Sequence, residues 1–223
     1  GVNVYMKDGA KWTGFTIGEV EVVMEGNDTT WYGFNLAERE EDDVNNINGG
    51  LFLTLKDGAL WKNAINSEQH GSLKDALVYD FKGDGGFIDM TGRETFIAHN
   101  DASHADGSNG VAEKRQTSIE VINNATTGNL VISNYSGDTT VIYRHDNENV
   151  TNILGGTTTI KKAAAGSNIT LSTDSTGIDM TNTGEVTDVL DKLAEKLFYN
   201  AYTTGERNLS GKVQIAEGLT TSS

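Results

Sequence analysis

Residues 51–61 read Leu-Phe-Leu-Thr-Leu-Lys-Asp-Gly-Ala-Leu-Trp, and residues 2–12 read Val-Asn-Val-Tyr-Met-Lys-Asp-Gly-Ala-Lys-Trp. A looser copy covers residues 20–31. Each copy is an alternating apolar strand, then a polar turn that contains Gly, then a Trp. The Trp residues are 19 and 30 positions apart, which is the size of one coil of a solenoid. Such repetition predicts stacked coils in which three side chains lie one above another: Met6, Met24 and Leu55.

The composition fits a thin stack of coils. Only 36% of the 223 residues are hydrophobic, which is low for a compact globule but suits a narrow solenoid. The chain has no Pro, as expected where nearly every segment donates backbone N–H groups to a ladder. It has no Cys, which excludes disulfides, thiol nucleophiles and thiolate metal sites.

The charge and the termini narrow the class of protein further. A net charge of −15 argues against binding to nucleic acid or to anionic lipid. No segment approaches the ~18 consecutive apolar residues of a membrane helix, so we expect no direct membrane insertion. The chain opens directly on a strand and stops within Thr220–Ser223. We therefore expect a fragment of a larger protein whose export and anchoring signals lie elsewhere.

Short apolar runs separated by Gly, Asn, Asp and Thr predict strands along most of the chain. Hairpins of a β-sandwich would produce the same local spacing, but the long-range repeat of Lys-Asp-Gly-Ala-x-Trp favours stacked coils. Regularly spaced residues lead the strands of the second half: Ile119, Leu130, Val141, Ile160 and Ile169. The predicted strands are 2–6, 20–24, 51–55, 76–81, 86–90, 94–98, 118–122, 129–133, 139–143, 157–161, 168–172 and 177–180.

One segment has helical periodicity instead. Asn182 is placed to cap a helix over about residues 185–199, with Glu185 three residues later. Apolar residues on one face of this helix are spaced by three and four positions: Val186, Val189, Leu190, Leu193, Leu197 and Phe198.

The alternation returns at residues 212–216, so a coil resumes after the helix. We divide the chain accordingly into β-solenoid coils over 1–181 and a second part over 182–223, which holds the helix and the resumed coil.

Four segments carry a resemblance to the passenger regions of large bacterial autotransporter and haemagglutinin-like adhesins: Leu53–Trp61, Ser167–Asp174, Tyr202–Leu209 and Val213–Thr220. The resemblance implies an all-β fold, a right-handed parallel β-helix of the pectate-lyase-like kind. It also implies export to the surface of a Gram-negative-type cell through an outer-membrane barrel. The family has no general catalytic set to transfer to this chain.

Two polar clusters are candidate metal or binding sites. His99, Asp101, His104 and Asp106 offer imidazole and carboxylate ligands within eight residues, although a surface loop between strands is the simpler explanation. Another cluster surrounds a glycine-rich turn, where oxygen ligands would hold Ca²⁺ and a tight turn is the simpler explanation: Asp80, Asp84 and Asp89.

The recurring Trp12, Trp31 and Trp61 have two interpretations. Identical residues at one coil position usually stack inside a solenoid as a core column. The alternative is an outward row of rings that binds sugars. The fixed offset of each Trp from its strand favours the core column.

Catalytic motifs are missing from the sequence. It contains neither a Gly-x-Ser-x-Gly elbow nor a His-Glu-x-x-His pair, and the basic residues of the middle coils, Arg93, Arg115 and Arg144, form no evident set.

The sequence thus predicts a non-catalytic, surface-displayed adhesin fragment without a cofactor, which binds a host or bacterial surface protein or glycan through its loops. The candidate loops are residues 33–49, 99–116 and 143–156. Two alternatives stay open: a β-helix polysaccharide lyase or hydrolase, and a purely structural spacer.

Overall fold

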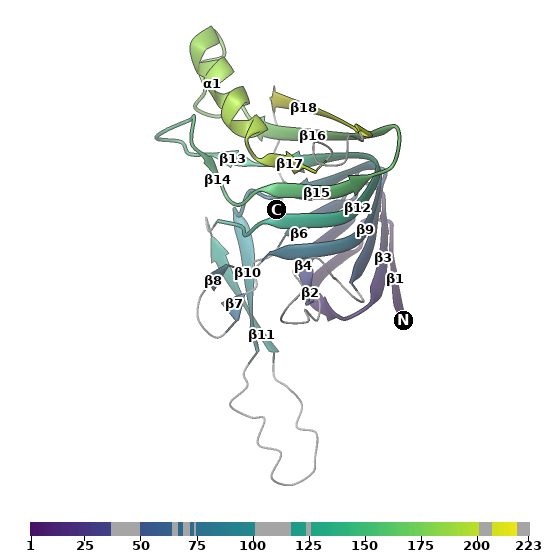
Figure 1. Cartoon of the computed structure of the whole chain (residues 1–223). Coiled ribbons are helices and arrows are strands. Elements are labelled where there is room, and N and C mark those ends of the chain that lie inside the picture. The colour runs from purple at the N-terminus through teal and green to yellow at the C-terminus, as the bar shows by residue number, and fades with distance from the viewer. Residues whose placement is uncertain are drawn as a thin grey trace.

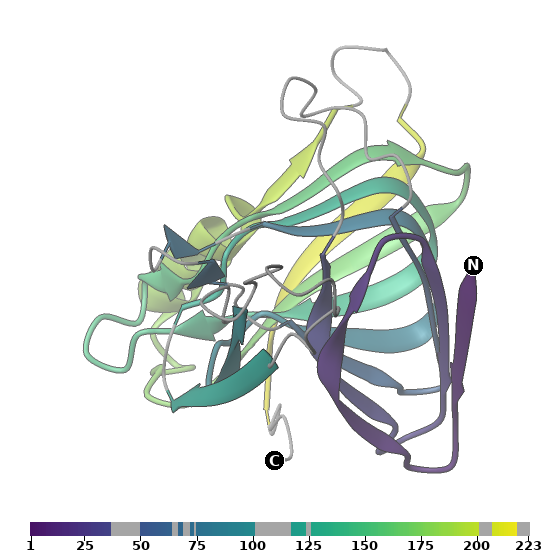
Figure 2. The same ribbon diagram turned by 90° about the horizontal axis from the view of Figure 1, so that it is seen from below.

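The computed structural model describes residues 1–36, 50–63, 67–68, 72–73, 75–100, 117–123, 126–200 and 207–217; of Ile17 and of residues 67–68, 72–73, 94–100 and 117–123 it describes the backbone alone. Twelve of the described strands form one sheet in which every paired neighbour is parallel. The sheet is strongly curled, so that its two halves face each other across a common core (Figures 1 and 2).

Two paths of hydrogen-bonded strands run through this sheet. The first ladder consists of β1 (Val2–Met6), β3 (Val20–Glu25), β5 (Leu51–Lys56), β9 (Ala76–Asp89), β12 (Leu130–Ile142), β15 (Thr158–Ala163) and β17 (Leu197–Tyr199). The second ladder consists of β2 (Lys11–Ile17), β4 (Thr30–Leu36), β6 (Leu60–Asn63), the second halves of β9 and β12, β16 (Ser167–Asp174) and β18 (Leu209–Ala216). We call one strand of the first ladder together with the following strand of the second ladder a rung.

Successive rungs lie in the register that the sequence repeat predicts. Met6 is paired with Met24, and Met24 with Leu55. The prediction that these three side chains lie one above another is therefore confirmed. The parallel pairing also argues against a sandwich of antiparallel hairpins.

The three Trp residues stack inside the molecule. The rings of Trp12 and Trp31 are 5.2 Å apart, and those of Trp31 and Trp61 are 5.7 Å apart. Trp31 and Trp61 are only 0% and 1% exposed. The core-column prediction is confirmed, and the outward sugar-binding row is wrong. Apolar residues continue this column in the following rungs: Ile88, Val141, Leu171 and Val213.

An Asp-Gly turn leads from the first ladder into the second. At residues 7–10 and 56–59 the amide of the last residue donates to the carbonyl of the first, at 3.1 and 3.0 Å. Both central residues have positive φ, 56° and 76° for Asp8 and Gly9, and 49° and 83° for Asp57 and Gly58. This is a type I′ turn, which Asp-Gly favours because both residues tolerate φ > 0.

The strand predictions were incomplete around these turns. Each Trp begins or lies within a strand of the second ladder, so β2, β4 and β6 occupy segments for which no strand was predicted. The predicted pairs 76–81 and 86–90, and 129–133 and 139–143, are the single bent strands β9 and β12. No strand forms at 177–180, because Gly177 at φ 75° turns the chain and Ile178 donates to the carbonyl of Ser175.

Among the described residues, three short antiparallel pairs lie outside the stack. They are β7 (Ser67–Glu68) with β8 (Ser72–Leu73), β10 (Glu94–Asn100) with β11 (Thr117–Asn123), and β13 (Arg144–His145) with β14 (Ile153–Leu154). Ile119 therefore belongs to a hairpin. The prediction that it leads a strand of the stack is wrong.

The helix α1 (Thr183–Ala194) is shorter than predicted. Its start agrees with the sequence, because Asn182 Oδ1 accepts from the amide of Glu185 at 3.1 Å. Its end does not, because Leu197–Tyr199 forms β17 and pairs with β15. Ladder hydrogen bonds there prevail over the helical spacing of Leu197 and Phe198. Val189 and Leu193 are fully buried against the stack, and β18 then resumes the second ladder, as predicted.

Gly33 provides a test of the close contact between rungs. A Cβ atom there would lie 1.8 Å from the carbonyl oxygen of Gly14 and 2.5 Å from Nε1 of Trp31. We expect Gly33→Ala to lower the free energy of unfolding by about 2 kcal/mol, since overpacking a core costs about that much. Urea unfolding followed by Trp fluorescence measures it. Gly184→Ala is the control, because its nearest neighbour is 3.5 Å away and Ala favours the helix; equal losses in both variants would contradict the prediction.

Candidate functional site

The described chain departs from the stack mainly at one place in each rung. Segments 37–50, 64–75, 90–129, 143–157 and 175–196 each follow a strand of the second ladder and precede the next strand of the first. We call these segments the excursions. The described parts of four of them, β7–β8, β10–β11, β13–β14 and α1, gather along the same side of the curled sheet (Figure 1). Insertions at this side leave the ladders intact, so it is the natural place for binding residues.

A buried ionic cluster lies where three excursions begin. Asp174 is the last residue of β16, His145 lies three residues beyond β12, and Arg93 lies four residues beyond β9. We call these three residues the Asp174 cluster. The Asp174 carboxylate accepts from the Arg93 guanidinium through Oδ2. Its other oxygen, Oδ1, is 3.3 Å from Nε2 of His145 and accepts from the amide of Thr176 at 3.1 Å.

The imidazole of His145 is enclosed by these contacts. Its side chain is 1% exposed, while that of Asp174 is 11% exposed. Its second ring nitrogen, Nδ1, is 3.3 Å from the carbonyl oxygen of Asp146. Acceptors on both sides favour the imidazolium form, in which both nitrogens donate.

The charges shift the two pKa values in opposite directions. The hydrogen bond with Asp174 raises the pKa of His145, although burial acts against this. Burial alone would raise the pKa of Asp174. The hydrogen bonds from His145 and Arg93 and the positive charge of Arg93 outweigh burial and hold the pKa of that carboxyl well below its usual range. Both shifts favour the charged forms, the imidazolium of His145 and the carboxylate of Asp174.

The segment between β9 and β10 is fixed by further contacts. Asp89 is buried, and its Oδ1 accepts from the amide of Thr91 at 2.7 Å. Burial raises the pKa of Asp89. The Nε group of Arg144 donates to the carbonyl of Thr91 at 3.1 Å. Together with the Arg93 ion pair, these contacts hold the base of the β10–β11 hairpin on two neighbouring rungs.

The arrangement favours anchoring over chemistry. The His145 nitrogens and both Asp174 oxygens are already engaged by groups of the chain itself. Arg93 is the most open member, with 34% of its side chain exposed. The Asp174 cluster thus joins the starts of three excursions and sets how each leaves the stack.

The predicted histidine and aspartate cluster falls largely outside the described residues. His99 lies in β10 and is paired with Ser118 of β11, so it belongs to a hairpin strand and not to a loop. Asp101, His104 and Asp106 lie outside the part of the chain that the structure describes. This candidate binding site stays a prediction.

The three carboxylates of the predicted calcium site do not converge. Asp80 pairs with Asn134 in the first ladder, Asp84 lies exposed near the bend of β9, and Asp89 is buried at the far end of that strand. Within the described ranges no group of three or more His, Asp or Glu residues is placed to hold a metal ion. Calcium binding stays a prediction without support from these positions.

The candidate loops are placed only in part. Residues 33–36 continue β4, so the first loop begins later than predicted, and residues 37–49 are outside the described part. The predicted loop 143–156 contains the short β13–β14 pair. All three candidate loops belong to excursions at the same strand ends.

The Asp174 cluster was not recognised from the sequence. Arg93 and Arg144 were expected to form no set, but the structure brings both to the segment that follows β9. His145 and Asp174 were not singled out at all. The only available signal in the sequence was that these residues come shortly after the ends of strands in neighbouring rungs. That signal can be used only when the pairing of those strands is already known.

Comparison of the chain with protein-family models, curated proteins and solved structures finds no match. No helix among the described residues is long and apolar enough to cross a membrane.

Replacing His145 tests the charged state of the cluster. A raised pKa means that the ion pair stabilises the fold fully below the unfolded value of about 6.5 and that this contribution is lost as pH rises through the folded value. We expect His145→Asn to cost more free energy of unfolding at about pH 5.5 than at about pH 9. Urea unfolding at the two pH values measures this. An equal cost at both would mean that folding does not raise the pKa of His145, and a smaller cost at pH 5.5 would mean that the fold holds His145 neutral.

Removing the carboxylate of Asp174 tests whether the Asp174 cluster stabilises the fold. Asp174→Asn leaves Arg93 and His145 without their counter-charge, and we expect a loss of about 3 kcal/mol in unfolding free energy at neutral pH. The control is Asp188→Asn on the exposed face of α1, which is expected to change it by less than about 0.5 kcal/mol. A loss at Asp174 no larger than the control would show that the cluster does not stabilise the fold.

Proposed function

We propose that this chain is a non-catalytic segment of a bacterial surface adhesin. Its stacked rungs form a rigid rod, and its excursions bind partners. The fold of this rod is a right-handed parallel β-helix, as in the passenger regions that the sequence resembles. The partner is a host or bacterial surface protein or a glycan. The chain acts outside the cell, and an outer-membrane barrel carried elsewhere in the larger protein anchors it.

One observation carries this proposal. The rungs pair in parallel through the whole described stack, with register shifts between β5 and β9 and between β9 and β12, while excursions of different length, each beginning after a second-ladder strand, interrupt it. A scaffold under selection only for length has no need of long insertions, whereas a display scaffold places variable segments on a fixed frame.

The Asp174 cluster adds support. It links the exits of three excursions through charged groups whose hydrogen bonds are satisfied within the chain. A fixed exit reduces the entropy that an arm such as β10–β11 loses on binding. The net charge of −15 agrees with a protein or glycan partner and not with nucleic acid.

The experiment replaces the distal part of one excursion at a time. Asn100 and Thr117 form the last pair of the β10–β11 hairpin, so an Asn-Gly turn in place of residues 101–116 closes it. We expect the β circular dichroism spectrum to be unchanged and binding to intact host and bacterial cells and to an array of their surface glycans to be lost.

The matched control shortens another excursion in the same way. The amide of Asp146 donates to the carbonyl of Asn152 at 2.9 Å, so residues 147–151 are replaced by Asn-Gly. This variant is expected to bind as the parent does if residues 101–116 alone carry the contact, and to lose binding if the loop 143–156 takes part. If neither replacement alters binding, the excursions are not the binding elements and the chain is a spacer. New reducing or unsaturated ends on the glycans would identify a lyase or hydrolase instead.

A further inference from the structure

Six segments of the sequence have the pattern Asn-x-Ser/Thr, with x other than Pro, which is the acceptor pattern for N-linked sugars. Because a sugar is bulky and hydrophilic, the acceptor must lie on the surface, and the fold therefore decides which pattern can be used. One segment, which begins at Asn124, lies partly outside the described residues. The other five begin at Asn27, Asn134, Asn149, Asn168 and Asn208.

In three of these five segments, backbone groups already engage the polar atoms of the pattern. The Nδ2 groups of Asn134 and Asn168 donate to backbone carbonyls at 3.0 and 3.2 Å. The pattern at Asn27 depends on the hydroxyl of Thr29, which is completely buried and donates to a backbone carbonyl at 2.8 Å. These three patterns are therefore poorly available in the folded chain.

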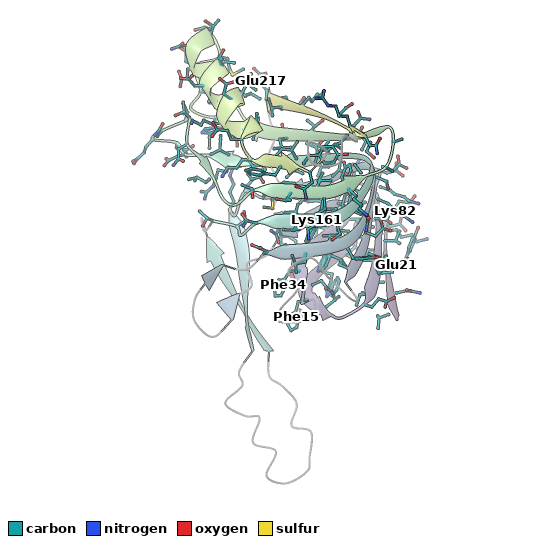
Figure 3. All side chains as sticks on the ribbon, in the orientation of Figure 1. Phe15, Glu21, Phe34, Lys82, Lys161 and Glu217 are labelled. Atoms are coloured by element: carbon teal, nitrogen blue, oxygen red, sulfur yellow. The ribbon has the colours of Figure 1, made fainter. Side chains whose placement is uncertain are left out.

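The pattern at Asn149–Thr151 lies on the loop between β13 and β14, in one of the excursions. Figure 1 shows this loop projecting from the side of the sheet, and Figure 3 shows its side chains at the outer edge of the molecule. Asn149 is exposed, and within the described residues its Nδ2 group donates to no acceptor. The nitrogen that would carry a sugar is therefore accessible.

Hydrogen bonds within the loop fix the position of this pattern. The amide of Asp146 donates to the carbonyl of Asn152 at 2.9 Å, and the amide of Asn152 donates to the carbonyl of Asn149 at 2.9 Å. Val150, the middle residue of the pattern, packs against the hydrophobic core. The loop thus presents the acceptor in a defined conformation.

The hydroxyl of the pattern contacts the acceptor amide directly. Oγ1 of Thr151 donates to Oδ1 of Asn149 at 3.0 Å, so the hydroxyl engages the oxygen of the amide and leaves the nitrogen unengaged. No such hydrogen bond joins Asn208 and Ser210 in the described part of the chain, where Ser210 belongs to β18 and pairs with Asn168. Exposure and geometry together favour Asn149 as the acceptor.

We infer that Asn149 is an attachment site for an N-linked sugar. A glycosyltransferase brings a sugar whose anomeric carbon is linked to a diphosphate. A bond forms between Nδ2 of Asn149 and the anomeric carbon, and the bond from that carbon to the diphosphate breaks. The diphosphate leaves with the electron pair, and the amide nitrogen gives up one proton. The inference goes beyond the proposed function, since this transfer does not depend on whether the excursions bind a partner.

Sugar transfer to the purified, folded chain tests the site. The probe is UDP-glucose with a soluble asparagine glycosyltransferase whose activity is confirmed on a standard Asn-x-Thr peptide. Peptide mapping by mass spectrometry is expected to find a hexose at Asn149 and none at Asn134 or Asn168. Free peptides of residues 130–138 and 164–172 are expected to accept the sugar, because the fold and not the local sequence protects these two segments. No hexose at Asn149, or equal modification of Asn134 or Asn168 in the folded chain, would show that the inference is wrong.

Variants of the pattern separate its two groups. Asn149→Gln is expected to abolish transfer to this loop, and Thr151→Val to slow it at least about tenfold, while Thr151→Ser retains it. The urea unfolding curve is expected to be the same for all three variants, since neither side chain belongs to the hydrophobic core. Equal transfer rates for Thr151→Val and Thr151→Ser would overturn the part assigned to the hydroxyl.

Mass spectrometry of the chain isolated from the cells that produce it tests the same site in its natural setting. A sugar on Asn149 that is absent from the Asn149→Gln variant is the expected result. Asn149 found entirely unmodified there would overturn the assignment, whatever the enzyme does to the purified chain.

Discussion

Backbone hydrogen bonding between successive parallel strands is the constraint on which this structure depends. Because β1, β3 and β5 pair without a slip, each side chain lies over its counterpart in the next rung. A shift of one residue would move every apolar side chain to the other face. Repetition in the sequence is thereby converted into columns such as Trp12, Trp31 and Trp61, in which the indole N–H groups of Trp31 and Trp61 add hydrogen bonds between rungs.

This constraint acts on the strands and corners but not on the segments that follow the second ladder. Between β9 and β12 the chain makes an excursion of 40 residues and then returns to the same register, with Leu130 beside Ala76. Loop closure costs only about 0.6 kcal/mol for each doubling of loop length, so such insertions are tolerated. The stack is therefore suited to carry segments of varied length and composition on one side.

An acidic chain places its buried charges where excursions leave the stack. The carboxylate of Asp174 is compensated by Arg93 and His145, and each comes from a different rung. A buried pair of this kind contributes little net stability compared with an apolar core, but it penalises any other arrangement of the same segments. Its position is consistent with a role in orienting the excursions.

The sequence by itself determined the parallel stacking, the register of Met6 with Met24 and Leu55, and the inward column of Trp residues. These features follow from the repeat, because strands with the same alternation of apolar and polar residues pair with their own copies. It also determined the start of α1 at Asn182, since a cap depends on residues within one turn. Only the tertiary structure decided that Leu197 leaves the helix for β17 and that the residues after each Asp-Gly turn form a second ladder. Pairing across 39 residues, as between Thr158 and Leu197, leaves no mark in a local pattern. The Asp174 cluster has the same origin, because Arg93 and Asp174 are 81 positions apart and meet only when three rungs are stacked.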